Sequence, residues 1–324
     1  MSRYWLSILI PVYNVESYIE QCLFSFAKQL DRSIEVILLD DCSTDQSIII
    51  AKKIISSHPQ IRIIAHDKNA GLSAARNSLL KHAQGDYIWF LDSDDFLMPQ
   101  AIGRLKTIVN TKNPDLILCD FLMHRDRLRL KHKLRGELHR KSFKGTANTL
   151  IHNKNQLICG CYATGRLHIW SKIAKRALWD TIQFPAGRLM EDVATTPYLL
   201  MRAESFYYCP EVWVAYRQRP GSILSTPNPL RLRDSSLASD GVLTTWKKRF
   251  PQLNRHAEFY FAHFCSKTLV GNIKKLCRSA AADEIRWHQQ QYRNNIQRSP
   301  VWVIWEYVKR GWFIKAIQLA QSLR

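Results

Sequence analysis

Apolar positions in the first 120 residues alternate between short continuous runs and helical spacing. Runs typical of buried strands occupy residues 6–10, 34–39, 61–65 and 87–91. Apolar residues three or four positions apart predict helices over residues 15–30, 46–57 and 71–83. Strands that alternate with helices of this length predict an α/β fold with a parallel sheet and helical crossovers. In detail, Pro11 is expected to end the first strand, and Asn14 and Asp45 to cap the two helices that follow.

Polar side chains follow three of these strands at the point where each strand ends. Tyr13 and Asn14 follow the first strand, Asp40 and Asp41 follow the second, and an acidic cluster follows the fourth. In parallel sheets, ligands bind beyond the carboxyl ends of the strands. The coincidence of strand ends and polar clusters therefore predicts an enzyme site at this edge of the sheet.

The acidic cluster consists of Asp92, Asp94 and Asp95, directly after the buried strand at 87–91. Three carboxylates at the edge of a core are costly unless a cation or hydrogen-bond donors compensate them. Oxygen ligands at this spacing suit Mg²⁺ or Mn²⁺, and such ions usually also bind a substrate's phosphates. One Asp could simply cap a helix that starts near Pro99, but three exceed that need. The cluster therefore predicts a metal and diphosphate site.

Two common phosphate-binding signatures are absent. The chain contains neither G-x-G-x-x-G nor G-x-x-x-x-G-K-[ST], so dinucleotide oxidoreductases and P-loop enzymes lack their main signature here. The phosphates must then be neutralised by a metal ion and basic side chains.

The pattern changes after a further strand predicted at residues 116–119. Basic residues occupy every second position, with leucines at three of the positions between them: Arg125, Arg127, Arg129, Lys131, Lys133 and Arg135. This period of two predicts a strand with one basic face. Two interpretations stay open, an edge strand protected by its charge or a face that meets the phosphates of an acceptor or a membrane.

The last third of the chain predicts helices. Glu191 and Asp192 open a predicted helix that reaches Leu200, where acids are often only partners of the helix dipole. From Leu230 onward the sequence predicts aromatic-rich helices, and the last two, at 300–307 and 312–323, combine tryptophans with lysine and arginine. These last helices are either a packed hairpin or an interfacial membrane element. We expect a catalytic domain over residues 1–225 and a helical region over 226–324.

The net charge of +20 is unevenly distributed. Through Asp120 there are 12 Lys and Arg against 14 Asp and Glu, whereas the remainder has 35 against 13. The back part therefore carries a net +22, which favours a polyanion or an anionic membrane surface as its partner.

The eight cysteines have no framework or metal-knuckle spacing, which fits a reducing cytoplasm. The apolar run at the start is short and contains Pro11, so no signal peptide is expected. No stretch of about 18 uncharged apolar residues occurs, so no transmembrane helix is expected either.

The chain resembles the inverting glycosyltransferases of family 2. The segments that carry the resemblance are SILIPVYNVESYI, EVILLDDCSTDQS, NAGLSAARN, GDYIWFLDSDD, the MED element and YRQRPGSI. They cover about the first two-thirds of the chain, and the tail carries little of the resemblance. It implies a glycosyltransferase A-type fold, in which helices flank a Rossmann-like, mostly parallel sheet, here with a C-terminal helical extension.

The resemblance also implies roles for individual residues. The nucleotide would contact Pro11, Tyr13, Asn14, Glu16, Asp41, Arg76, Asp92 and Ser93. Within this set, Asp41 would accept the N–H of the base, which favours uracil. Asp94 and Asp95 would hold Mn²⁺ or Mg²⁺, Asp192 would be the catalytic base, and Arg219 and Ser222 would close over the diphosphate. Ser78 stands where the family often has Gly, and we expect it to alter packing rather than chemistry.

The implied activity is metal-dependent transfer of a hexosyl or N-acetylhexosaminyl group from a nucleotide sugar, UDP-linked by the argument above. The acceptor would be a glycan or lipid-linked glycan in capsule, lipooligosaccharide or exopolysaccharide synthesis. The enzyme would then be cytoplasmic and peripheral at the inner membrane. Another nucleotide-dependent transferase, such as a nucleotidyltransferase, is the alternative, although its Gly-rich basic loop is missing after the first strand. A nucleic-acid partner has no recognition motif in its support.

Overall fold

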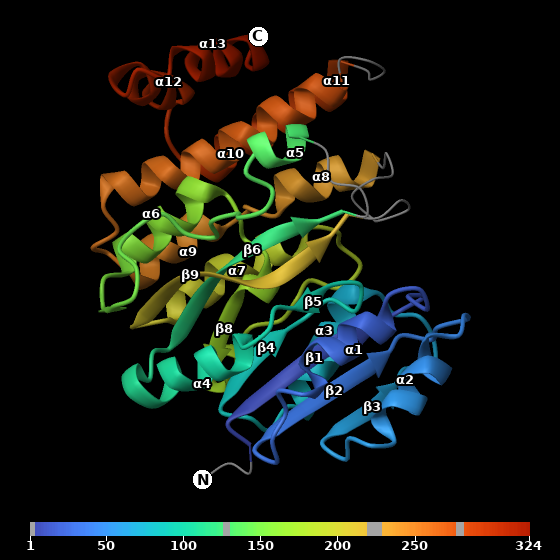
Figure 1. Ribbon diagram of the computed structural model, residues 1–324. Coiled ribbons are helices and arrows are strands. Elements are labelled where there is room, and N and C mark those ends of the chain that lie inside the picture. The colour runs from blue at the N-terminus through green and yellow to red at the C-terminus, as the bar shows by residue number, and fades with distance from the viewer. Residues whose placement is uncertain (1–3, 126–129, 219–228, 277–281) are drawn as a thin grey trace.

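In the computed structural model, the described residues are 4–125, 130–218, 229–276 and 282–324. Within them, nine strands form one sheet in the order β3-β2-β1-β4-β8-β6-β9-β5, and β7 pairs with β9 (Figure 1). The strands are β1 Leu6–Val12, β2 Ile34–Asp40, β3 Ile61–Ala65, β4 Tyr87–Phe90, β5 Phe96–Leu97, β6 Leu116–His124, β7 Leu150–Ile151, β8 Lys172–Lys175 and β9 Phe206–Arg217.

The first four strands form the parallel part of the sheet. β1 lies between β2 and β4, parallel to both, and β3 is parallel to β2. The crossover helices are α1 Ile19–Ala27, α2 Ser47–Ile55 and α3 Leu72–His82. Apolar strand residues such as Ile8 and Ile37 are fully buried between the helical layers. The predicted α/β fold with a mostly parallel sheet and helices on its faces is therefore confirmed.

Two local predictions near the first strand are wrong. Pro11 does not end β1 but lies within it, opposite Leu39 of β2. It is tolerated because the pairing with β4 ends at Leu9, so the missing N–H removes no ladder bond on that side. Asn14 does not cap a helix. It has a left-handed backbone (φ 50°), and its Oδ1 accepts from Thr44 N at 2.9 Å, while α1 begins only at Ile19.

The second part of the sheet is mixed. β8 is antiparallel to β4 and β6, whereas β6 and β9 are parallel. The helices around it are α4 Ala101–Lys112, α6 Lys154–Thr164 and α7 Glu191–Arg202, with short 3₁₀ turns η1 Ile169–Ser171 and η2 Arg176–Trp179. No side chain caps the start of α4, so the acidic cluster before it has another role.

The predicted basic strand over 125–135 is wrong where the structure describes it. Residues 126–129 lie outside the described part, and Leu130–Leu134 form a helical turn, α5. Leu and Lys are good helix formers, and Lys is disfavoured in strands, so helix propensity outweighs the period of two in this segment. Leu130 and Leu134 are mostly exposed, at 72% and 81%.

The C-terminal helices stack on the sheet domain around one long helix. They are α8 Pro229–Leu237, α9 Val242–Arg249, α10 Arg255–Leu276, α11 Ala282–Ile296, α12 Pro300–Lys309 and α13 Phe313–Ser322. Figure 1 shows α12 and α13 on the side of α10 that faces away from the sheet. Tyr162 of α6 packs against Trp246 and Phe261, so one apolar core joins the helices to the sheet domain. The division at residues 225 and 226 stays a prediction. Among the described helices, none combines the length and apolar character needed to cross a bilayer.

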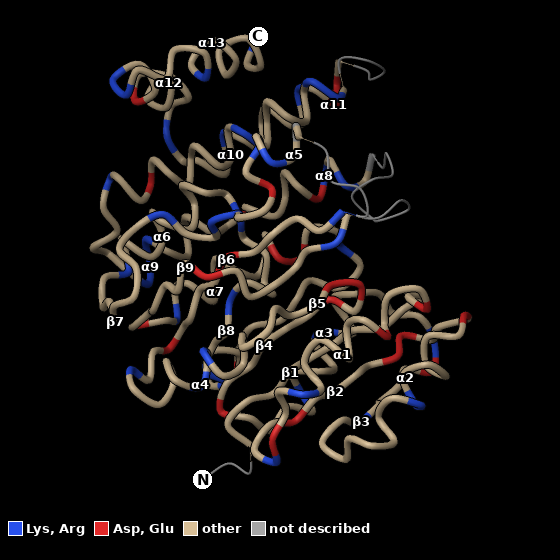
Figure 2. Tube along the Cα trace, viewed as in Figure 1, with Lys and Arg blue, Asp and Glu red and all other residues tan. Residues whose placement is uncertain are grey.

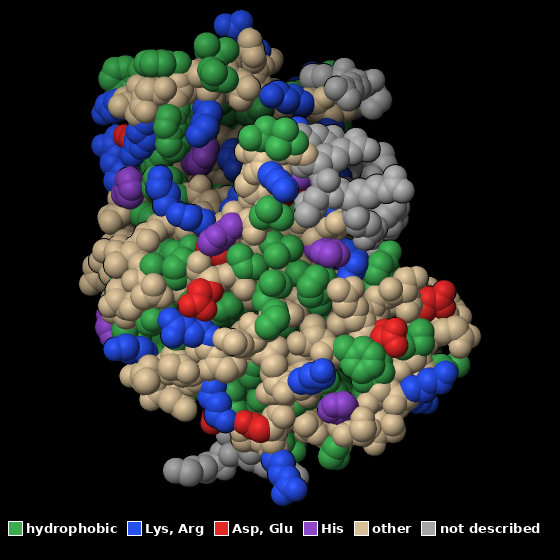
Figure 3. Space-filling view, viewed as in Figure 1, with side chains coloured by type: hydrophobic (Ala, Val, Ile, Leu, Met, Phe, Trp, Pro, Cys, Tyr) green, Lys and Arg blue, Asp and Glu red, His purple; other side chains and the backbone are tan. Residues whose placement is uncertain are grey.

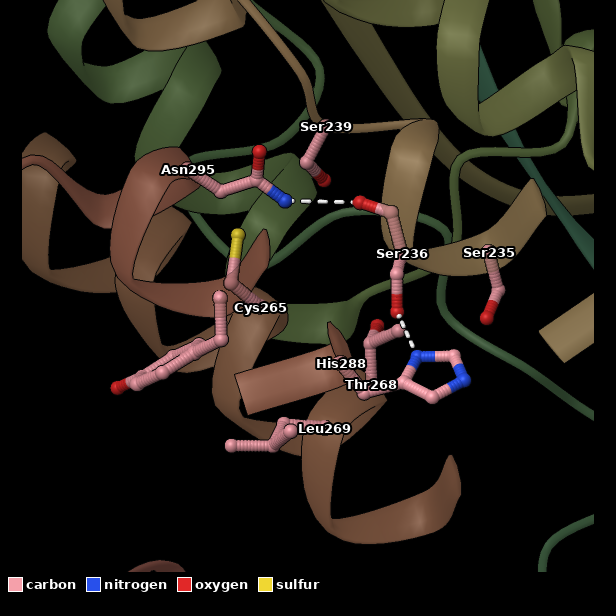
Figure 4. A pocket seen from close by; sticks show the side chains of 9 residues that line it. Ser235, Ser236, Ser239, Cys265, Thr268, Leu269, His288 and Asn295 are labelled. Atoms are coloured by element: carbon pink, nitrogen blue, oxygen red, sulfur yellow. Dashed lines mark hydrogen bonds between the residues drawn. The ribbon is translucent and has the colours of Figure 1, made fainter. Parts of the chain in front are cut away.

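A buried polar network ties α8 to α10 and α11 (Figure 4). His288 Nδ1 lies 2.7 Å from Ser236 Oγ, and Asn295 Nδ2 donates to Ser236 O at 2.8 Å. Burial lowers the pKa of His288, so it is neutral at pH 7. The small cavity at this network contains none of the predicted site residues, and we interpret it as part of the packing.

Candidate active site

The acidic cluster lies where β4 ends, as predicted, but its members differ in environment. Asp92 has 26% of its side chain exposed, and Asp94 is also partly exposed, whereas Asp95 is buried at 1%. Burial, followed by repulsion from Asp94 and Asp92, raises the pKa of Asp95 well above its usual value. The cluster is therefore short of positive charge.

Arg217, at the end of β9, contacts this cluster. Its backbone N donates to Asp95 Oδ1 at 2.8 Å, and its Nε donates to Asp94 O at 2.8 Å. A further bond joins its Nη2 to Gln21 Oε1 of α1. The other oxygen of Asp95, Oδ2, is buried and has no hydrogen-bond partner. Burying a carboxylate oxygen without a hydrogen-bond donor is unusual and lowers the stability of the folded state. A bound cation would compensate the oxygen and remove this penalty.

Arg76, on α3, joins carboxylates that are 100 residues apart in the chain. Its guanidinium binds Asp92 Oδ1 at 2.8 Å, Glu191 Oε1 at 2.7 Å and Asp192 Oδ1 at 2.6 Å. The side chain is 1% exposed and lies over the rings of Phe90 and Phe184. Burial would lower the pKa of Arg76, but the three carboxylates raise it further than burial lowers it. The arginine is thus permanently charged and fixes the distance between the acidic cluster and α7.

Glu191 and Asp192 open α7, and both point at Arg76. Burial, opposed by Arg76 and reinforced by Asp192, raises the pKa of Glu191 to about 7. Asp192 Oδ2 accepts a second bond, from Ile169 N at 3.2 Å. Because only 13% and 16% of these side chains are exposed, they are more than dipole partners at a solvated helix end.

Asp41 directly follows β2 and is 3% exposed. Its oxygens accept from Ala70 N at 2.9 Å and Gly71 N at 2.8 Å. His66 Nδ1 lies 2.7 Å from the same carboxylate, and Ser78 Oγ lies 2.8 Å from His66 Nε2. Ser78 therefore does more than pack, because its hydroxyl contacts the histidine that contacts Asp41.

The residues after β1 connect this strand to the loop after β2. Glu16 Oε2 accepts from Gln46 N at 2.9 Å, and Asn14 contacts Thr44 as described above. Tyr13 is 48% exposed and is available to a ligand, and Pro11 is buried within β1. The predicted contacts of Tyr13, Asn14 and Glu16 with a nucleotide stay predictions, since their observed bonds are within the protein.

An aromatic stack lies between the acidic cluster and Asp192. The ring of Trp170 lies 4.8 Å from that of His168 and 5.4 Å from that of Tyr216, both nearly parallel to it. Burial and the charges of Asp95, Asp92 and Asp94 raise the pKa of Tyr216, which places its hydroxyl near that cluster. Burial lowers the pKa of His168 to about 3, so it is neutral. Trp170 is 1% exposed, so the stack is part of the packed interior that connects the two ends of the site.

The acidic cluster fits a divalent cation. Among the described residues, no group of three or more His, Cys, Asp or Glu already converges as a complete ligand set. Mg²⁺ and Mn²⁺ are commonly held by one or two carboxylates together with substrate phosphates. Asp95, with its unpartnered oxygen and raised pKa, and the neighbouring Asp94 stay the carboxylates predicted to hold such an ion.

Most of the predicted site residues meet at one edge of the sheet, with the acidic residues drawn in red in the loops there (Figure 2). Arg219 and Ser222 lie outside the described residues. Sequence reasoning missed the contacts of His66, His168 and Arg217. Arg217 belongs to the YRQRPGSI segment and could have been found there, whereas the two histidines carry no local signal.

Comparisons with known proteins place the chain in a family. The model of "Glycosyl transferase family 2" matches residues 7–173. Glycosyltransferase GlyA of Streptococcus pneumoniae is 29% identical over 220 residues, which are 67% of this chain but only 31% of that protein. The chain thus spans under a third of that relative's length.

Solved structures share the fold. The crystal structure of S. aureus TarS 1–349 in complex with UDP has a TM-score of 0.70 at 20% identity and covers 98% of this chain and 90% of its own. The mannosyltransferase PcManGT from Pyrobaculum calidifontis, in complex with GDP-Man and Mn²⁺, has a TM-score of 0.54 at 14% identity and covers 99% of this chain and 86% of its own. These likenesses confirm the predicted glycosyltransferase A-type architecture.

Proposed function

Because the chain belongs to glycosyl transferase family 2, we propose that it transfers a hexosyl or N-acetylhexosaminyl group from a UDP-sugar to a glycan acceptor, with a metal ion and with inversion. The observation that carries this proposal is the Arg76 cluster. The buried guanidinium of Arg76 binds both Asp92, which belongs to the acidic cluster, and Asp192, which belongs to α7. It therefore brings these two parts of the chain together at one site. TarS in complex with UDP and PcManGT in complex with Mn²⁺ support the choice of nucleotide and metal.

In this mechanism each group has a separate task. Asp94 and Asp95 would hold the divalent ion, which supplies charge stabilisation for the departing diphosphate when bound. Asp192 would accept the proton of the acceptor hydroxyl as that oxygen attacks the anomeric carbon. Attack from the side opposite the diphosphate inverts the anomeric configuration. Asp192 suits this role because it comes from α7, while the diphosphate ligands come from the end of β4.

The donor pocket would be completed after β1 and β2. Asp41 is held by two backbone amides and His66, so its orientation is fixed before a ligand arrives. A carboxylate oxygen can accept more than one hydrogen bond, and the imide N–H of uracil is the donor we assign to it. Tyr13 and Asn14 would line the same pocket from the end of β1.

The test is release of UDP, measured across UDP-glucose, UDP-galactose and their N-acetyl forms, with Mn²⁺ and with excess chelator. We expect release from at least one donor and its loss with chelator. Release of pyrophosphate from UTP instead would support the alternative, a nucleotidyltransferase. Metal-independent release would contradict the role of Asp94 and Asp95.

We propose further that the α12–α13 hairpin contacts an anionic membrane that carries the acceptor. One side of the hairpin packs on α10 through Val303, Tyr307 and Leu319, which are buried. The other side exposes apolar residues, namely Val301, Trp305, Val308, Phe313, Ile314 and Ile317. Over residues 300–324, Glu306 is the sole acidic residue and is paired with Arg255 and Arg310. An apolar face with Trp and a net positive charge suits the interface of an anionic bilayer.

A further inference from the structure

Four basic side chains form a row between the sheet domain and the C-terminal hairpin. We call Arg140, Arg166, Lys267 and Lys315 the cation row. Arg166 follows α6, Lys267 lies on α10 and Lys315 lies on α13. Figure 3 shows Lys and Arg side chains around the hollow below α12 and α13.

Packing brings these cations together. α6 ends at Gly165, whose left-handed backbone (φ 64°) turns the chain toward α10. A Cβ built at Gly165 would lie 3.4 Å from Lys267 Nζ, so Arg166 and Lys267 are close neighbours. Lys315 Nζ lies 3.6 Å from the ring centre of Trp312, which in turn packs against His263 of α10.

Among the described residues, no member of the row forms a salt bridge with a carboxylate. Arg166 donates to the backbone O of Lys141 at 2.6 Å, and Arg140 Nε is buried without a hydrogen-bond partner. Arginines elsewhere in the helical region behave differently, since Arg298 binds Glu258 and Arg233 binds Glu284. The members of the row therefore lack the ion pairs that these two arginines form.

Burial and a neighbouring cation together lower the pKa of three of these basic side chains, as expected for cations that lie close together. Burial, followed by the charge of Arg140, lowers the pKa of Arg166, and the nearby carboxylate of Asp120 offsets only part of this shift. Burial and the charge of Arg166 lower the pKa of Lys267, and burial and the charge of Lys267 lower the pKa of Lys315. Each cation thus repels the next, and an anion along the row would relieve that repulsion.

The row begins beside the catalytic base. Arg166 lies over the ring of Phe121 at 5.7 Å, and Phe121 contacts the rings of His168 and Trp170. Ile169, which lies between His168 and Trp170 in the chain, donates its N–H to Asp192. The acidic cluster that would bind the donor's metal and diphosphate lies at the other end of the aromatic stack, next to Tyr216.

We propose that the cation row binds the phosphate groups of the acceptor and leads its terminal hydroxyl to Asp192. The acceptor class is then a phosphate-bearing glycan, either a chain of phosphodiesters or a glycan on a lipid diphosphate. This inference rests on the proposed function, because it assigns the acceptor side of the same site. The row would hold the acceptor's phosphates at the end of the site where Ile169 and Asp192 lie.

The test uses the full chain and short linear inorganic polyphosphate as the probe. Lys267→Gln with Lys315→Gln removes two exposed cations of the row, and Lys112→Gln with Lys248→Gln removes two exposed cations elsewhere. Calorimetric titration should show binding by the wild type and a roughly tenfold or greater loss in the row variant. The slope of log K against log salt should become shallower by about 1, since fewer counterions are displaced. The control variant should bind within about twofold of the wild type.

Equal weakening in both variants would show that net charge alone attracts the anion, and would overturn the proposal. So would an unchanged affinity in the row variant. Arg166→Gln, checked by its melting temperature, provides a second test at the buried end of the row. Vesicles with anionic phospholipid test the bilayer itself as the source of phosphate, because a row variant that loses vesicle binding but keeps polyphosphate binding would make the row a membrane contact and overturn the proposal. Release of UDP by the wild type is measured independently, so failure of the proposed function is distinguishable from failure of this inference.

Discussion

Arg76→Met should destabilise the protein strongly and in a pH-dependent way. Arg76 is 1% exposed, and its three carboxylate partners have 13–26% of their side chains exposed, so solvent screens these ion pairs little. Methionine keeps much of the volume and the contacts with Phe90 and Phe184 but removes the charge. Removing one partner from a buried ion-pair network costs about 3–5 kcal/mol, because charged groups are left behind without compensation.

The sign of the pH dependence follows from Glu191. Its pKa is raised to about 7 in the folded protein, above its value of about 4.3 in an unfolded chain. The folded state therefore binds the proton more tightly, and this group's contribution to stability falls as pH rises between those two values. Without Arg76 the folded pKa rises further, so the loss of stability on Arg76→Met should be larger at pH 8 than at pH 5, by at least about 1 kcal/mol.

The measurement is urea unfolding of wild type and variant at pH 5 and pH 8. Arg104→Met is the matched control, because Arg104 pairs with Glu211 at the surface, with 42% and 47% of the two side chains exposed. Such a pair contributes about 0–1 kcal/mol. A loss in Arg76→Met as small as that of the control, or one that does not change with pH, would refute the assignment of Arg76 as the cation that compensates this site.

Three further predictions concern function. Asp94→Ala should abolish metal-dependent UDP binding and transfer while the melting temperature stays near that of the wild type, because one anion of a repelling cluster is removed; wild-type turnover would rule out the metal role. Asp192→Asn should lower turnover by roughly 10²-fold with donor affinity nearly unchanged, as for loss of a general base. If donor affinity fell equally, Asp192 would be a binding residue and Glu191, with its pKa of about 7, the better candidate. Trp305→Ser with Ile314→Ser, both at exposed positions, should reduce sedimentation with anionic liposomes; a wild type that ignores such liposomes at low salt would contradict membrane contact.

The donor side of the site is predictable from sequence because its residues sit at the ends of strongly patterned strands. Five buried residues precede Asp92, and a similar run precedes Asp41. Once the strands are predicted to be parallel, their carboxyl ends must share one edge. The contact of Arg76 with Glu191 and Asp192 could not be predicted from spacing, because it depends on how α7 packs against α3.

Two wrong predictions of local structure also arise because strand pairing and helix propensity decide the outcome, and neither follows from periodicity alone. Proline is disfavoured in a central strand, but Pro11 is accommodated because the pairing of β1 with β4 ends at Leu9. The basic period of two over 125–135 has the spacing of a strand, but Leu130–Leu134 form a helical turn. Periodicity alone could not resolve that competition between pattern and helix propensity.

The proposed acceptor side could not be predicted from the sequence, because its residues are far apart in the chain. Arg166, Lys267 and Lys315 are spread over 150 residues, and each is an ordinary basic residue in its own helix or helix end. They become one surface only because α10 packs against both α6 and α13. The charge excess of the back part favours a polyanion as partner, yet it is distributed over 48 charged side chains. A charge count favours an anionic partner, whereas the proposed place of binding rests on neighbouring cations that form no ion pair with a carboxylate in the described part of the chain.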